Sequence, residues 1–139
     1  MEKSKLDTEE LMRLMEATPE VFDSLDLAEA VPLGDHLAAL LRGRDMTAAQ
    51  LVERSGLSKS FVYQVLSGDR APGRDVLLRM AFTLRLDLRE TQRLLTVARK
   101  GGLYPKVRRD AALICCIGRG YGLFETDEFL ESAGERPLL

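Results

Sequence analysis

Apolar residues recur at helical spacing along most of this 139-residue chain, and no stretch of useful length alternates apolar with polar residues as a half-buried strand does. The leucines between positions 33 and 41, for example, fall at i, i+4, i+7 and i+8, on one face of a helix. Leu and Ala dominate the composition, aromatic residues make up only 6%, and Trp is absent. Because this composition also favours helix over sheet, we expect an all-α fold.

Capping residues, glycines and prolines divide this pattern into separate helices. We expect helices over about 7–17, 33–42, 48–54, 58–66, 75–84, 87–98, 109–117 and 126–133. The acidic stretch from residue 18 to residue 32 is expected to be mainly irregular. The chain is thus predicted to consist of an acidic N-terminal helix and linker arm (1–32), a five-helix central domain (33–98) and a C-terminal helical hairpin (99–139).

The net charge of −2 conceals a strong asymmetry along the chain. Residues 1–40 carry three basic and ten acidic side chains, whereas residues 41–110 carry fifteen basic and seven acidic ones. A basic centre favours a polyanionic partner such as nucleic acid, although solvated arginine-rich helix faces would give the same count. The acidic arm instead favours a protein partner or a masking role toward the basic centre.

Little in the sequence supports catalysis, a metal site or a cofactor site. Cys115 and Cys116 are adjacent, so we interpret them as small hydrophobic residues of a helix in a reducing compartment. The one histidine, His36, lacks a nucleophile motif and is expected to lie at the surface. The longest apolar run, 111–117, is too short to span a membrane, and the N-terminus does not resemble a signal peptide. We therefore expect a cytoplasmic protein that is not an enzyme and has no membrane contact.

Two of the expected helices are separated by a three-residue turn, Ser-Gly-Leu at 55–57, which is typical of helix-turn-helix DNA-binding proteins. Four stretches around this turn share one family pattern, namely LGDHL (33–37), MTAAQLVERSGLSKSFV (46–62), SGDRAP (67–72) and LLRMAFTLRLDL (77–88). With these stretches, residues 33–95 resemble the Cro/C1-type (XRE, lambda-repressor-like) helix-turn-helix domain. The resemblance implies a lambda-repressor-like domain of five helices that binds double-stranded DNA.

In this family the third helix lies in the major groove, with its N-terminal residues against base edges. The resemblance therefore implies four base-reading residues, Lys59, Ser60, Tyr63 and Gln64. Lys donates to guanine, Gln pairs with adenine and Ser serves either base, so the residue types suit the task. It also implies five residues that hold backbone phosphates, Ser58, Ser67, Arg70, Arg44 and Arg74. The alternative for Lys59, Ser60 and Gln64 is an ordinary exposed helix residue, and for Tyr63 a partly buried aromatic residue.

Two features lie outside the family pattern. Arg85 stands where the family commonly has a glycine in a left-handed helix cap, so we expect backbone strain or a different loop there. The apolar C-terminal hairpin is too hydrophobic to remain solvated. It is expected to pack either on the central domain or on a second subunit, and the second arrangement would give a homodimer.

These observations favour a transcriptional regulator that binds a palindromic operator as a dimer and represses. The alternative is a protein-interaction module, such as an antitoxin or an adaptor, whose acidic arm (1–32) docks a partner protein. The two functions are compatible in one molecule.

Overall fold

The computed structural model describes residues 9, 10, 12, 13 and 31–139. The chain forms two units, Met1–Val31 and Pro32–Leu139, and each is considered by itself. In the first unit, residues 9, 10, 12 and 13 are helical, in agreement with a helix over about 7–17. The other residues of that expected helix, and most of the arm expected to dock a protein partner (1–32), lie outside the described residues.

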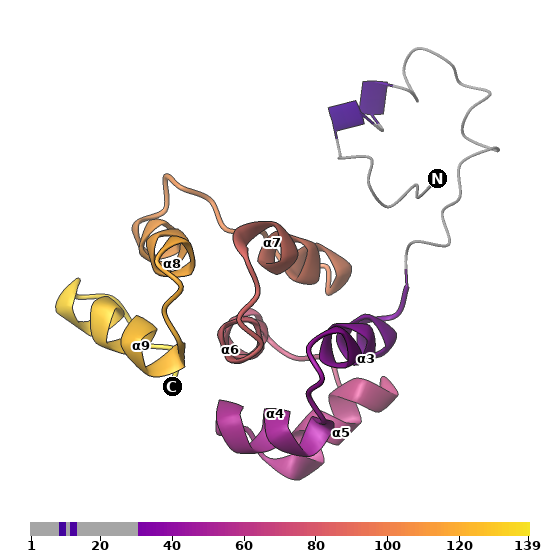
Figure 1. Cartoon of the computed structure of the whole chain (residues 1–139). Helices are drawn as coiled ribbons and strands as arrows, with labels where there is room; N and C mark the ends of the chain where they lie inside the picture. The colour runs from indigo at the N-terminus through magenta and orange to yellow at the C-terminus, as the bar shows by residue number, and fades with distance from the viewer. Residues whose placement is uncertain (1–8, 11, 14–30) are drawn as a thin grey trace. The chain divides into compact units, whose positions relative to one another are not determined.

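In the second unit all regular structure is helical, which confirms the all-α prediction for the described residues. The helices are α3 (Leu33–Gly43), α4 (Ala48–Ser55), α5 (Lys59–Ser67), α6 (Arg74–Thr83), α7 (Leu88–Val97), α8 (Arg108–Gly118) and α9 (Leu123–Ser132). Helix α6 lies in the middle of this unit, with α3–α5 on one side and the α8–α9 hairpin on the other (Figure 1). Within the described ranges, no helix is long and apolar enough to cross a membrane.

One hydrophobic core runs through the whole second unit. It contains Leu37 of α3, Leu77 of α6 and Leu94 of α7, together with Leu113 of α8 and Leu130 of α9, all with no exposed surface. The C-terminal hairpin therefore packs on the helices of its own chain, which was one of the two arrangements expected for it. It completes the core on which α5 also rests.

A crossed pair of ion pairs ties the hairpin to the start of α6. The Arg74 guanidinium makes two hydrogen bonds to the Asp110 carboxylate, at 3.0 and 2.8 Å. The Asp75 carboxylate accepts two from Arg109, at 2.9 and 3.2 Å. Each of the two helices thus contributes one Arg and one neighbouring Asp, and each Arg pairs with the Asp of the other helix. Such bidentate pairs fix geometry as well as adding energy.

Helix α3 crosses α5 without room for a side chain at Gly34. A Cβ atom at this position would overlap the backbone carbonyl of Leu66 and lie 3.2 Å from the carbonyl oxygen of Val65. Both neighbours are backbone atoms, which cannot rotate away. Gly34 therefore sets how closely the two helices approach.

Three expectations about single residues need correction or qualification. The last helix begins at Leu123 rather than near Thr126, because Glu125 accepts a hydrogen bond from the Gly122 amide at 2.8 Å and caps the helix earlier. His36 is half-buried rather than at the surface, and its Nε2 has no hydrogen-bond partner. Cys116 is fully buried as expected, but Cys115 is exposed.

Candidate nucleic-acid interface

Helix α5 presents one polar face to solvent because its two buried valines face the core. Val62 and Val65 are buried. The side chains predicted to read bases lie on the remaining surface, where Lys59, Ser60 and Tyr63 are exposed and Gln64 is partly buried. At the start of the helix the Ser58 hydroxyl accepts from the Phe61 amide at 3.1 Å. Ser58 is therefore an N-cap that fixes the end of α5 from which Lys59 and Ser60 project.

The turn between α4 and α5 is held by local hydrogen bonds and by one distant arginine. Gly56 has a φ of 74°, the left-handed conformation that ends α4. The buried Ser55 hydroxyl accepts from the Leu57 amide at 3.2 Å. Arg79 of α6 donates to the Ser55 carbonyl at 2.8 Å. The angle between α4 and α5 is thus fixed from outside the turn as well as within it.

Arg79 is a positioning residue that the sequence reasoning missed. It is the charged member of an otherwise apolar run, Leu77 to Phe82, and that was the available signal. A charged side chain in a buried run needs a polar partner. The carbonyl at the end of α4 supplies it.

A hydrogen-bonded cluster links α5 to the loop that follows it. Arg70 Nε donates to Gln64 Oε1 at 2.9 Å, and Gln64 Nε2 donates to Ser60 Oγ at 3.3 Å. The Arg70 guanidinium also lies over the Phe61 ring, 5.5 Å from its centre. The Ser67 hydroxyl donates a hydrogen bond to the Asp69 carboxylate at 3.1 Å. Seven of the nine predicted DNA contacts, Ser58, Lys59, Ser60, Tyr63, Gln64, Ser67 and Arg70, therefore lie on or beside one helix.

The other two predicted contacts are engaged elsewhere in the fold. The Arg74 guanidinium binds Asp110 and also donates to the carbonyls of Gly101 and Gly102, both at 2.9 Å. Arg44 donates to the Leu84 carbonyl at 2.7 Å and to Glu90 at 2.7 Å. A phosphate contact from either arginine would have to compete with these bonds. Their role in DNA binding stays a prediction.

The carboxylates that hold these two arginines have lowered pKa values. Burial by itself would raise the pKa of Glu90, but hydrogen bonds from Arg44 and the Asp87 amide, with the Arg44 charge, outweigh it. Burial likewise opposes the shift at Asp110, where hydrogen bonds from Arg74 and the Tyr104 amide lower the pKa below its ordinary value. Both carboxylates are therefore charged at neutral pH and keep the arginines in place.

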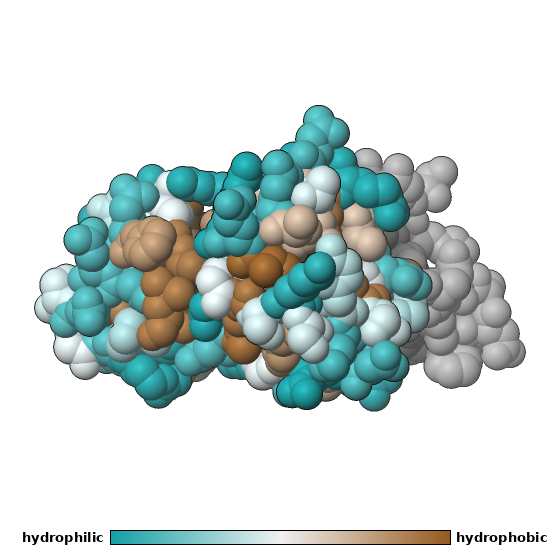
Figure 2. Space-filling model, turned by 90° about the horizontal axis from the view of Figure 1, so that it is seen from below, coloured by the Kyte–Doolittle hydropathy of each residue, from teal (hydrophilic) through white to brown (hydrophobic). Residues whose placement is uncertain are grey.

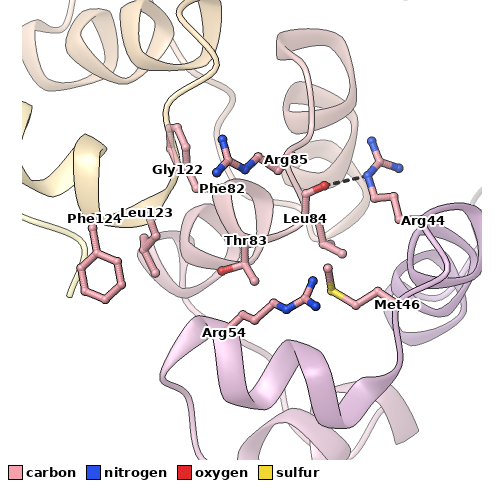
Figure 3. Close-up of a pocket in the computed structure, with 10 residues that line it drawn as sticks. All are labelled: Arg44, Met46, Arg54, Phe82, Thr83, Leu84, Arg85, Gly122, Leu123 and Phe124. Atoms are coloured by element: carbon pink, nitrogen blue, oxygen red, sulfur yellow. Dashed lines mark hydrogen bonds between the residues drawn. The ribbon is translucent and has the colours of Figure 1, made fainter.

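Arg44 borders a groove of about 470 Å³ that does not include α5. Arginines from three places surround it, namely Arg44, Arg54 of α4 and Arg85 after α6 (Figure 3). The other lining residues include Met46, Phe82, Leu84, Leu123 and Phe124.

In the view from below, apolar side chains reach the surface in two groups among hydrophilic ones (Figure 2). Arg85 has a φ of 58°, so the expected strained backbone is present.

Comparison with known proteins identifies the stretch that contains α5. A family model described as "Helix-turn-helix domain" matches residues 32–94, which span α3 to most of α7. No curated protein and no solved structure matches the chain significantly. The match agrees, at the level of a helix-turn-helix domain, with the resemblance inferred from the sequence over residues 33–95.

Proposed function

We propose that the protein is a DNA-binding transcriptional regulator and not an enzyme, because a helix-turn-helix family model matches residues 32–94. The observation that carries this proposal is the exposed polar face of α5. Lys59, Ser60 and Tyr63 are exposed in the N-terminal half of this helix, whose start Ser58 caps. Helix α5 would enter the major groove and read base edges from this face. Such a role would place the protein in the compartment that contains the DNA.

Direct binding tests this proposal. Fluorescence anisotropy would compare the duplex from the gene's own upstream region with a scrambled duplex, each over a salt series. Lys59→Ala and Gln64→Ala are expected to weaken binding to the upstream duplex much more than to the scrambled one, because base contacts carry the sequence preference. Lys106→Ala removes an exposed lysine outside the matched residues and serves as the charge-matched control. Equal affinity of the parent protein for both duplexes would remove sequence reading from the proposal.

A finer proposal concerns assembly and outcome. We propose that the protein binds a palindromic operator as a dimer and represses, because helix-turn-helix proteins commonly place two recognition helices one DNA turn apart. Light scattering of the protein on duplexes with one half-site and with two would measure the stoichiometry. One protomer on the two-site duplex would contradict the dimer, and a reporter gene activated by the protein would contradict repression.

The acidic arm supports a second candidate function, docking of a partner protein. This proposal depends on the charge of the arm, since residues 1–32 carry three basic against nine acidic side chains. If the arm masks the basic centre, deleting residues 1–32 should tighten DNA binding. Unchanged affinity would rule out masking and leave partner docking to be tested by co-purification.

A further inference from the structure

The orientation of the Gln64 amide is determined by chemistry and not only by geometry. The Arg70 guanidinium has donors but no acceptor, so the Gln64 atom at 2.9 Å from Arg70 Nε must be the amide oxygen. The amide nitrogen therefore lies on the other side, where it donates to Ser60 Oγ at 3.3 Å. That bond is long, and the second hydrogen of the amide nitrogen has no partner in this cluster.

Arg70 is held in place by more than this one bond. Its guanidinium lies over the Phe61 ring at 5.5 Å, within the range of a cation–π contact. Its backbone amide donates to the Gln64 carbonyl at 3.2 Å, and the neighbouring Asp69 amide donates to the same carbonyl at 2.9 Å. The loop that carries Arg70 is thus bonded to the residue that Arg70 orients.

This arrangement has a consequence for base recognition. Bidentate recognition of adenine by glutamine needs the amide oxygen to accept from adenine N6 and the amide nitrogen to donate to N7. The Gln64 oxygen keeps a second lone pair, but a donor that reached it would lie beside the Arg70 guanidinium, which is itself a donor and positively charged. Gln64 therefore offers the groove chiefly its amide nitrogen, a donor. Guanine presents two adjacent acceptors, O6 and N7, whereas adenine presents a donor beside its single acceptor.

From this geometry we propose that Arg70 is a specificity-determining residue that makes Gln64 select guanine over adenine. The proposal rests on the proposed function, since α5 must enter the major groove for Gln64 to meet a base. It differs from a phosphate contact by Arg70, because a phosphate contact changes affinity without changing base preference. Release of the amide oxygen should let Gln64 bind adenine in the bidentate mode.

The experiment is selection of bound duplexes from a pool with a randomised core, carried out with the full chain. Four proteins are compared, namely the parent, Arg70→Ala, Gln64→Ala and the control Arg89→Ala, which removes an exposed arginine of α7. The position that loses its preference in Gln64→Ala is the one that Gln64 contacts. Competition anisotropy with duplexes that differ only at this position then measures the preference, and thermal melts verify that each variant is folded.

We expect the parent and Arg89→Ala to prefer guanine over adenine at this position by about twofold to tenfold, the contribution of one neutral hydrogen bond. Arg70→Ala should lose this preference or turn it toward adenine. A parent protein that prefers adenine, or an Arg70→Ala variant with the parent's preference, would overturn the inference. Failure of the parent to enrich any sequence is a different result, because it would remove the proposed sequence-reading function itself.

Discussion

Replacement of Gly34 by alanine should destabilise the second unit although it adds a good helix former to α3. The Cβ atom would overlap the Leu66 carbonyl oxygen and lie only 2.9 Å from the Leu66 carbonyl carbon. Ordinary van der Waals contact begins near 3.4 Å. Helices α3 and α5 must therefore separate by at least half an ångström, taken roughly from the usual carbon contact distance. Both neighbouring groups are backbone, so no side-chain rotation relieves the overlap.

Two opposing effects determine the size of the change. Alanine favours a helix interior over glycine by about 0.8–1.0 kcal/mol, and less in the first turn where Gly34 lies. Overpacking typically costs about 1–3 kcal/mol, and occasionally more where the neighbour cannot move. We expect a net loss on the order of 1–2 kcal/mol in the free energy of unfolding, which lowers the Tm by roughly 4–8 °C in a unit of this size.

Gly43 provides the matched control because it lies in the same helix and a Cβ there meets nothing within 4 Å. Gly43→Ala should be neutral or stabilising by up to about 1 kcal/mol. Thermal and urea unfolding followed by circular dichroism would measure both variants. If Gly34→Ala unfolds at the same Tm as Gly43→Ala, the close crossing of α3 and α5 is not a constraint and the reasoning is refuted.

Three further predictions concern the ion pairs, the histidine and the strained backbone. Asp110→Ala leaves the Arg74 guanidinium and the Tyr104 amide without their carboxylate and should lower the free energy of unfolding, measured in urea, by about 2–3 kcal/mol. In the Asp110→Ala background, Arg74→Ala should cost less than it does alone. Fully additive effects would show that the pair is not coupled. Burial, with the nearby Arg93 charge, lowers the pKa of His36 below its ordinary 6.5, so the folded state favours the neutral ring. Stability should therefore fall as the pH drops from about 6.5 through the folded pKa. A His36→Gln variant with the parent's pH dependence over that range would contradict this. Arg99 has a φ of 59°, and Arg99→Gly should raise the Tm by roughly 4 °C because the left-handed conformation costs an L residue about 1 kcal/mol or more; an unchanged or lower Tm would count against stored strain there.

The stability of the fold should fall in a second step at lower pH, where the paired carboxylates become protonated. Burial acts to raise the pKa of Asp75, but hydrogen bonds and charges from Arg109 and Arg136 outweigh it and lower the pKa below its ordinary 3.8. The stability that Asp75, Asp110 and Glu90 provide is thus present above their unfolded pKa values and is lost as the pH falls through the folded ones. This loss of stability occurs at lower pH than the loss that protonation of His36 causes.

Local sequence signals determined the helices and the exposed face of α5. The predicted starts of α4 and α5 are close to the observed ones because Thr47 and Ser58 cap these helices, and Gly56 ends α4 in a left-handed conformation. These signals succeed because a cap or a helical face depends on residues three or four positions apart. The start of α9 was predicted wrongly, near Thr126 instead of Leu123, because Glu125 accepts from the Gly122 amide and caps the helix earlier.

Tertiary structure alone decided how the helices are fixed to one another and which predicted contacts remain free for DNA. Gly34 is constrained by a backbone 32 positions away, Arg74 is occupied by Asp110 across 36 positions, and Arg44 by Glu90 across 46. Partners at such separations leave no periodic trace in one sequence, because they meet only after the helices have packed. For the described residues, the sequence by itself thus determined the helices and the polar exposed face of α5. The packed fold decided that Arg44 bonds Glu90, that Arg74 bonds Asp110 and that Arg70 bonds Gln64.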